Sequence, residues 1–210
     1  IVSIAKQAEF QYLDVKIEPL MDIIDEMFFE DKNRKVIIFT EFVATQSYLS
    51  RLLKDRGYSN SLLNGSLNMD ERNAILAEFK TETDILISTD AGGEGLNLQF
   101  SNCVINYDLP WNPMKIEQRI GRVDRIGQQR DVEVFNFLLA DTIENRVKDV
   151  LEEKLSVILN EIGIDKYSDV LDSELAGMNF TDAYMNSIRN SKDIDYNIKP
   201  IEENLKKEVQ

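Results

Sequence analysis

The chain has 210 residues, of which 43% are hydrophobic, and this is enough apolar material for one domain of ordinary size with an appendage. It contains no histidine and one cysteine, which excludes Ser-His-Asp or Cys-His catalysis, a histidine-bound metal and an internal disulfide framework. No apolar run of about 18 residues offers a membrane span, no secretory signal is visible, and the formal net charge of −14 argues against a general affinity for nucleic acid.

The first 63 residues contain a helical pattern followed by strand patterns. Residues 1–34 are predicted to be helical and amphipathic, because Leu20, Ile24 and Met27 recur at spacings of three and four. Residues 36–39 form a continuous apolar run, which predicts a strand buried on both faces. A helix with leucines on one face follows and ends at Gly57, and a short strand is expected at 61–63.

Alternation of helices and strands continues to residue 140. Asn68 and Glu71 match a capping box at the start of a helix, and strands are expected at 85–87, 104–107 and 132–139. Asn112-Pro113 marks the start of a helix that is expected to run through Asp124. This order predicts an α/β fold, with a mainly parallel sheet covered by helices and a site in the loops at the carboxyl ends of the strands. Further helices are expected at 141–163 and 182–190.

Residues 118–128 read QRIGRVDRIGQ and carry the most informative pattern in the chain. On a helix, Arg119, Arg122 and Arg125 share one face, and the repulsion between them predicts an anion nearby. Arginine suits phosphate because its planar guanidinium binds two oxygens at once. The alternative is a solvated helix face whose arginines pair with acidic neighbours on the same helix.

A glycine-rich turn at residues 88–97, STDAGGEGLN, follows the strand expected at 85–87. Its three glycines would expose successive backbone N–H groups as an anion nest, although any tight turn also uses glycine. No Gly-Lys pair followed by Ser or Thr occurs in the chain, so it lacks the usual lysine phosphate loop of NTPases. Arginines without that loop predict a domain that completes a nucleotide site begun elsewhere, and the isolated chain is therefore expected to be inactive.

Four ordered segments resemble the C-terminal helicase lobe of superfamily-two motors, and specifically the Swi/Snf-type DNA-dependent ATPases. They are residues 35–40 with the helix after them, 63–66 with Arg72 and Phe79, 88–98 with 107–113, and 118–128. Trp-Asn-Pro at 111–113 and Arg-Ile-Gly-Gln at 125–128 look like Swi/Snf signatures of the bacterial or archaeal type. The resemblance covers residues 35–150 and implies a RecA-like three-layer domain with helical N- and C-terminal extensions.

The resemblance also implies roles for particular residues. Arg125 is expected to be the arginine finger on the γ-phosphate of ATP held by another lobe, with Arg122 as its partner and Gln118 as a positioner of phosphate or water. Gly95 and Asn97 look like contacts on the ribose side. The residues expected to face the nucleic-acid backbone are Thr40, Gly65, Ser66, Ser88, Thr89 and Gly92. Glu94 departs from the family, where a small, apolar or basic residue is common.

By the same resemblance, residues 1–34 lead in from a preceding lobe, 35–140 form the helicase lobe and 141–210 form a helical extension. ATP with Mg²⁺ is expected to be held mainly by an N-terminal RecA-like lobe of the same polypeptide, and no metal ligand is expected here. The other implied partners are double-stranded DNA and a DNA-bound protein, in a cytoplasmic, nucleoid-associated setting, or a nuclear one in a eukaryote. Two alternatives stay open: a lobe of an RNA helicase or restriction-type motor, and a non-catalytic nucleic-acid-binding module.

Overall fold

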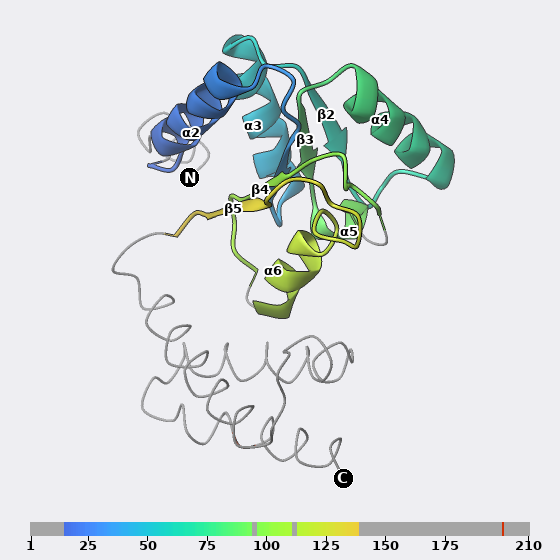
Figure 1. The fold of residues 1–210 in the computed structure, drawn as a ribbon. Coiled ribbons are helices and arrows are strands. Elements are labelled where there is room, and N and C mark those ends of the chain that lie inside the picture. The colour runs from blue at the N-terminus through green and yellow to red at the C-terminus, as the bar shows by residue number, and fades with distance from the viewer. Residues whose placement is uncertain (1–14, 94–95, 111–112, 139–198, 200–210) are drawn as a thin grey trace, which may run out of the picture.

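A computed structural model describes residues 15–93, 96–110, 113–138 and 199, which form an α/β domain (Figure 1). The helices are α2 (Ile17–Glu30), α3 (Val43–Asp55), α4 (Met69–Thr81), the short α5 (Asp90–Gly93) and α6 (Pro113–Ile120). The strands are β1 (Val36–Phe39), β2 (Asn60–Leu63), β3 (Ile85–Ser88), β4 (Cys103–Asn106) and β5 (Glu133–Asn136). None of these helices is both long enough and apolar enough to span a bilayer.

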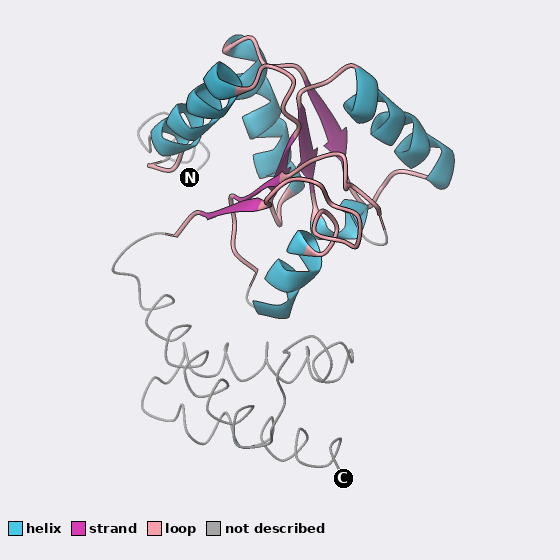
Figure 2. Cartoon of the chain, viewed as in Figure 1, coloured by secondary structure: helices cyan, strands magenta, loops and turns pink. Residues whose placement is uncertain are grey.

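The five strands form one sheet in the order β2-β3-β1-β4-β5, and every pair of neighbours is parallel. The central strand β1 pairs with β3 and β4, with Val36 opposite Ile85 on one side and Cys103 on the other. Figure 2 shows α2 and α3 on one side of the strands and α4 on the other. The predicted α/β fold with a parallel sheet is therefore confirmed, and the carboxyl ends of all five strands lie along one edge.

The two faces of the sheet bury separate apolar clusters, because successive residues of a strand point to opposite sides. Val36 and Ile38 of β1 pack in the cluster under α2 and α3. Ile37 and Phe39 pack in the other cluster, with Phe79 of α4. All four residues of β1 are buried, as the continuous apolar run predicts for a strand covered on both faces.

Helix α2 packs on the sheet itself. Leu20, Met21, Ile24 and Met27 are buried in the same cluster as the strand residues. Cys103 of β4 lies against Met27, and burial raises the pKa of its thiol to about 12, so that the thiol stays protonated. The domain boundary at residue 34 stays a prediction, but α2 contributes to the core of the lobe.

Two local signals in the sequence have the geometry that they predict. The Asn68 side chain accepts a hydrogen bond from Glu71 N, and the Glu71 carboxylate accepts one from Asn68 N, which completes the capping box of α4. Gly57 follows α3 with a φ of +92°, a conformation that glycine adopts without steric cost.

One predicted helix is too long. Helix α6 ends at Ile120, whereas the sequence pattern predicted that it would run through Asp124. After Ile120 the chain turns, because Arg122 O accepts a hydrogen bond from Leu98 N and Val123 enters the apolar core. The helices expected at 141–163 and 182–190 lie outside the described residues.

The position of α2 predicts the effect of shortening its apolar side chains. Ile24→Ala should lower the free energy of unfolding of the chain by about 2–5 kcal/mol, since it leaves a cavity between α2 and the sheet. Phe29→Ala is the matched control on the same helix, because Phe29 is 89% exposed. Urea unfolding followed by circular dichroism measures both. Equal effects of the two changes would show that α2 is not part of the folded core.

Candidate functional site

An open cavity of about 750 Å³ lies at the carboxyl edge of the sheet. The loop after β2 lines it with Asn64, Gly65 and Ser66. Helix α6 and the turn after it supply Lys115, Gln118, Arg119 and Arg122. The segments after β1 and β3 complete the wall. This is the edge at which parallel α/β sheets bind their ligands, as the sequence predicted.

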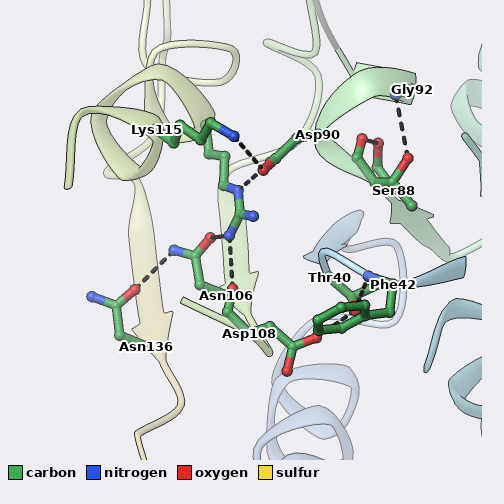
Figure 3. A network of polar contacts seen from close by, with 11 residues as sticks. Thr40, Phe42, Ser88, Asp90, Gly92, Asn106, Asp108, Lys115 and Asn136 are labelled. Atoms are coloured by element: carbon green, nitrogen blue, oxygen red, sulfur yellow. Dashed lines mark hydrogen bonds and ion pairs between the residues drawn. The ribbon is translucent and has the colours of Figure 1, made fainter. Parts of the chain in front are cut away.

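The guanidinium of Arg119 is buried behind this cavity, with a fractional exposure of 1%. Its Nε donates to Asp90 Oδ1 at 2.7 Å, and its Nη1 donates to Asn106 Oδ1 at 2.9 Å and to Asp108 O at 3.0 Å. The guanidinium carbon lies 5.1 Å from the centre of the Phe39 ring. Figure 3 shows Asp90, Asn106 and Asp108 around this network. Arg119 therefore ties α6 to the ends of β1, β3 and β4.

The predicted stripe of three arginines on one helix face is wrong. Arg119 is buried, Arg122 is partly buried in the cavity wall, and Arg125 is exposed. The helix α6 ends at Ile120, so Arg122 and Arg125 lie in the turn that follows and not on the helix. The acid that Arg119 pairs with lies on α5 and not on its own helix.

Arg125 lies on the surface beside the cavity but does not line it. Its Nε donates to Gly121 O at 3.0 Å and its Nη2 donates to Leu96 O at 3.2 Å. Both acceptors are neutral backbone carbonyls, so the charge of Arg125 is not neutralised by these two contacts.

The anion nest predicted for the glycine-rich turn is wrong for the two glycines that the structure describes there. Gly93 N donates to Thr89 O at 3.0 Å, and Gly92 N to Thr89 Oγ1 at 3.4 Å, so both N–H groups are used inside the protein. A Cβ on Gly92 would lie 2.5 Å from Leu63 O and 2.6 Å from Asn64 Cα. Glycine is needed at 92 because α5 packs directly on the backbone after β2. Glu94 and Gly95 lie outside the described residues.

The structure brings together only part of the predicted nucleic-acid surface. Gly65, Ser66 and Thr89 line the cavity. Thr40, Ser88 and Gly92 are buried and do not line it. Thr40 Oγ1 donates to the carboxylate of Asp108, and Ser88 Oγ donates to Thr89 O at 2.9 Å (Figure 3).

The nucleotide-side residues divide in a similar way. Gln118 and Arg122 line the cavity, whereas Asn97 and Arg125 lie outside its lining. The Asn97 amide donates to Gln99 Oε1 at 3.3 Å, and the side chain is exposed. Gln118 and Arg122 therefore share one cavity with Gly65, Ser66 and Thr89.

Three charged residues of the cavity had no individual role in the sequence-based prediction, although Glu41 and Asp90 lie in loops expected to carry the site. Lys115 Nζ lies 3.8 Å from Asp90 Oδ2, and Glu41 lines the wall nearby. Burial raises the pKa of the Glu41 carboxyl, and the charge of Asp90 adds to this effect. Asp90 and Glu41 each follow the end of a buried strand, which is the signal that could have identified them. Among the described residues, no three Cys, Asp or Glu side chains gather as a metal site.

The chain is similar to known ATP-dependent helicases. The family model described as "Helicase conserved C-terminal domain" matches residues 15–127. The "Uncharacterized ATP-dependent helicase YqhH" of Bacillus subtilis is 46% identical over 129 residues, which is 61% of this chain and 23% of that protein. The "RNA polymerase-associated protein RapA" of Vibrio campbellii is 34% identical over 156 residues, or 70% of this chain and 16% of that protein. The chain thus spans less than a quarter of these relatives.

A solved structure has the same fold. The C-terminal part of the Fun30 ATPase domain superposes with a TM-score of 0.58 and 24% identity, over 75% of this chain and 58% of that one. At this level of identity the likeness concerns the fold, and it agrees with a RecA-like helicase C-terminal lobe.

The environments of the arginines predict different effects on stability. Arg119→Lys should lower the free energy of unfolding by about 1–3 kcal/mol, because one ammonium cannot serve Asp90, Asn106 and Asp108 together and leaves a buried acceptor unpaired. Arg125→Lys is the control, and it should change stability by less than about 0.5 kcal/mol at its exposed position. Urea unfolding measures both variants. A loss of stability in Arg125→Lys as large as in Arg119→Lys would contradict this assignment.

Proposed function

Because the chain belongs to the helicase C-terminal domains of superfamily-two, Swi/Snf-type ATPases, we propose that it is the second motor lobe of an ATP-driven translocase on double-stranded DNA. It supplies the arginine finger, Arg125, and part of the DNA track. An N-terminal RecA-like lobe of the same polypeptide holds ATP with Mg²⁺. The observation that carries the proposal is the shared cavity, which Gln118 and Arg122 line together with Gly65, Ser66 and Thr89.

The position of Arg125 suits a finger that acts on a ligand bound elsewhere. A net hydrogen bond to a neutral carbonyl contributes only about 1 kcal/mol, and charge-assisted bonds to phosphate are roughly twice as strong. A γ-phosphate presented by the other lobe therefore displaces Gly121 O and Leu96 O as partners of Arg125. Arg119 suits this role less well, because its guanidinium is 1% exposed and its Nε and Nη1 already donate to groups at the ends of the strands.

The hydroxyl residues that line the cavity, Ser66 and Thr89, suit a phosphate backbone that is bound without strong attraction to cations. The hydroxyl oxygen of Thr89 accepts a hydrogen bond from Gly92 N, which leaves its hydrogen to donate to a phosphate oxygen. Ser66 lines the same cavity, and its N–H and hydroxyl both donate to Asn64 Oδ1, which a phosphate oxygen must replace as their acceptor. Neutral donors fit a chain with a net charge of −14. They neutralise few phosphates, so DNA binding by this lobe depends only weakly on salt.

Hydrolysis and DNA binding are connected through the Arg119–Asp90 pair. Asp90 follows Thr89 directly, and Arg119 follows Gln118 on α6. A displacement of α6 when ATP closes the two lobes is therefore transmitted to the turn that holds Thr89. A finger supplied in this way contributes about 10³–10⁵ in rate, and its withdrawal after hydrolysis opens the lobes for the next step. A DNA-bound protein in the path of the motor is the target.

Two variants of the complete motor protein test the proposal together. Arg125→Ala should lower both basal and DNA-stimulated kcat by about a thousandfold or more, with less change in ATP binding, because it removes a transition-state contact. Thr89→Ala should impair DNA stimulation and leave basal hydrolysis largely intact, because it touches the track and not the nucleotide. Steady-state ATPase assays with and without duplex DNA measure both.

Arg130→Ala is the matched control for the first variant. Arg130 is an exposed arginine near the same turn, and its ion pair with Asp31 at 3.1 Å is of the surface kind that contributes little. A mild effect of Arg125→Ala would place the finger elsewhere, with Arg122 the next candidate. Equal loss of basal and stimulated rates in Thr89→Ala would contradict the division of the cavity, and stimulation by RNA alone would contradict the DNA track.

A further inference from the structure

The turn that carries Arg125 is joined to the segment that leads into β4, residues 96–101, by hydrogen bonds in both directions. Leu98 N donates at 2.9 Å to the carbonyl oxygen of Arg122, which is three residues before Arg125 in the chain. The Gln99 side-chain amide donates to Ile126 O at 3.1 Å, directly after Arg125. The same Gln99 side chain accepts from the Asn97 amide at 3.3 Å. The backbone on both sides of Arg125 is therefore fixed to one neighbouring segment.

Gln128 provides the densest of these contacts. Its Nε2 lies 3.0 Å from Gln99 O, 3.0 Å from Ser101 O and 3.1 Å from Val123 O. An amide group has two hydrogens, so they are shared among three carbonyls. Its Oε1 accepts from Gln129 N at 2.9 Å and from Arg130 N at 3.2 Å. One side chain thus closes the turn on itself, from Val123 to Gln128, and fastens it to residues 99–101.

The backbone of the turn from Val123 to Gln128 is held in place by burial and by a hydrogen bond. Val123 is fully buried in the apolar core, and Gln128 N donates to Arg125 O at 2.9 Å. Gly127 between them has a φ of +102°, which allows the chain to reverse here. Within the described part of the chain the guanidinium of Arg125 donates to two carbonyls and no acid, so it can exchange these partners while the backbone of the turn stays in place.

We propose that Gln128 is a positioning residue for Arg125. Its side-chain amide fixes the backbone of the turn, so that the guanidinium swings from Leu96 O to a phosphate without any rearrangement of the loop. Gln128 acts through Arg125 and does not line the cavity. The inference rests on the proposed role of Arg125 as the arginine finger.

The chemistry of the contact requires an amide at position 128. Glutamate has the same size and keeps an oxygen toward Gln129 N and Arg130 N. Its second oxygen, however, replaces the donor and faces the carbonyls of Gln99, Ser101 and Val123. The repulsion displaces the turn, and a misplacement of about 1 Å costs a reaction roughly 100-fold in rate.

The test uses the complete motor protein with Gln128→Glu, and Gln129→Glu as the matched control. Gln129 is adjacent and exposed, and its side chain has no hydrogen bond within the described part of the chain, so the control makes the same chemical change without the contact. Gln128→Glu should lower kcat roughly 100-fold and leave the KM for ATP nearly unchanged, while Gln129→Glu should resemble the unmodified protein. A kcat of Gln128→Glu close to that of Gln129→Glu overturns the proposal.

A double variant separates positioning of Arg125 from general support of the fold. Single-turnover hydrolysis is measured for Arg125→Ala with and without Gln128→Glu. If Gln128 acts through Arg125, the second change adds no further loss. Losses that multiply overturn the proposal, because Gln128 then supports some other part of the motor.

The outcomes also separate this inference from the proposed function. A mild Arg125→Ala variant overturns the arginine finger and this inference with it, whereas a severe Arg125→Ala with a nearly normal Gln128→Glu overturns the inference alone. If Gln128→Glu does not fold, Gln128→Met takes its place, since it has a similar length and removes the amide donor to Gln99 O, Ser101 O and Val123 O without adding a charge. It should lower kcat by a smaller factor, again with no added loss in Arg125→Ala, and an unchanged kcat overturns the proposal.

Discussion

Arg119 donates from one buried guanidinium to groups at the ends of two strands: the carboxylate of Asp90 beyond β3, the amide of Asn106 in β4 and the backbone carbonyl of Asp108. The ring of Phe39, at the end of β1, covers its face. A charge held this far from water costs several kcal/mol if its partners are lost. Helix α6 therefore cannot separate from the sheet without breaking the whole set, and the cavity keeps its shape because of this constraint.

The arrangement of the other two arginines depends on the end of α6, which comes directly after Arg119. Beyond Ile120 the chain forms a turn, and Arg122 and Arg125 lie in it with different exposure from Arg119. Arg122 reaches the cavity, and Arg125 reaches the surface, where it rests on neutral carbonyls. The three arginines thus form a series from a buried guanidinium, through one in the cavity wall, to an exposed one, which we propose is the arginine finger. The side-chain amide of Gln128 holds the backbone of the turn that carries Arg125.

The sequence predicted the frame of the domain better than its site. The apolar run of β1, the Asn68 capping box and the strand-end loops could be read directly, because each is a local pattern. The end of α6 could not, since Gly121 and the spaced arginines fit a helix equally well until tertiary contacts at Leu98 and Val123 are known. Gly92 looked like part of an anion nest, and only the closeness of Leu63 shows that it serves packing. Helix α2 had a clear apolar face, but the pattern did not reveal what covers it.

We propose that Arg125 leaves its contacts within this lobe to meet a phosphate, while Arg119 keeps its pairing with Asp90. A crystal structure of the complete motor protein with DNA and a transition-state mimic of the γ-phosphate tests it most directly. We expect the Arg125 guanidinium about 3 Å from the mimic, no hydrogen bond from Arg125 to Leu96 O, and the Arg119–Asp90 pair unchanged from its 2.7 Å. A closed complex in which Arg125 still donates to Leu96 O, with another cation on the mimic, would contradict it.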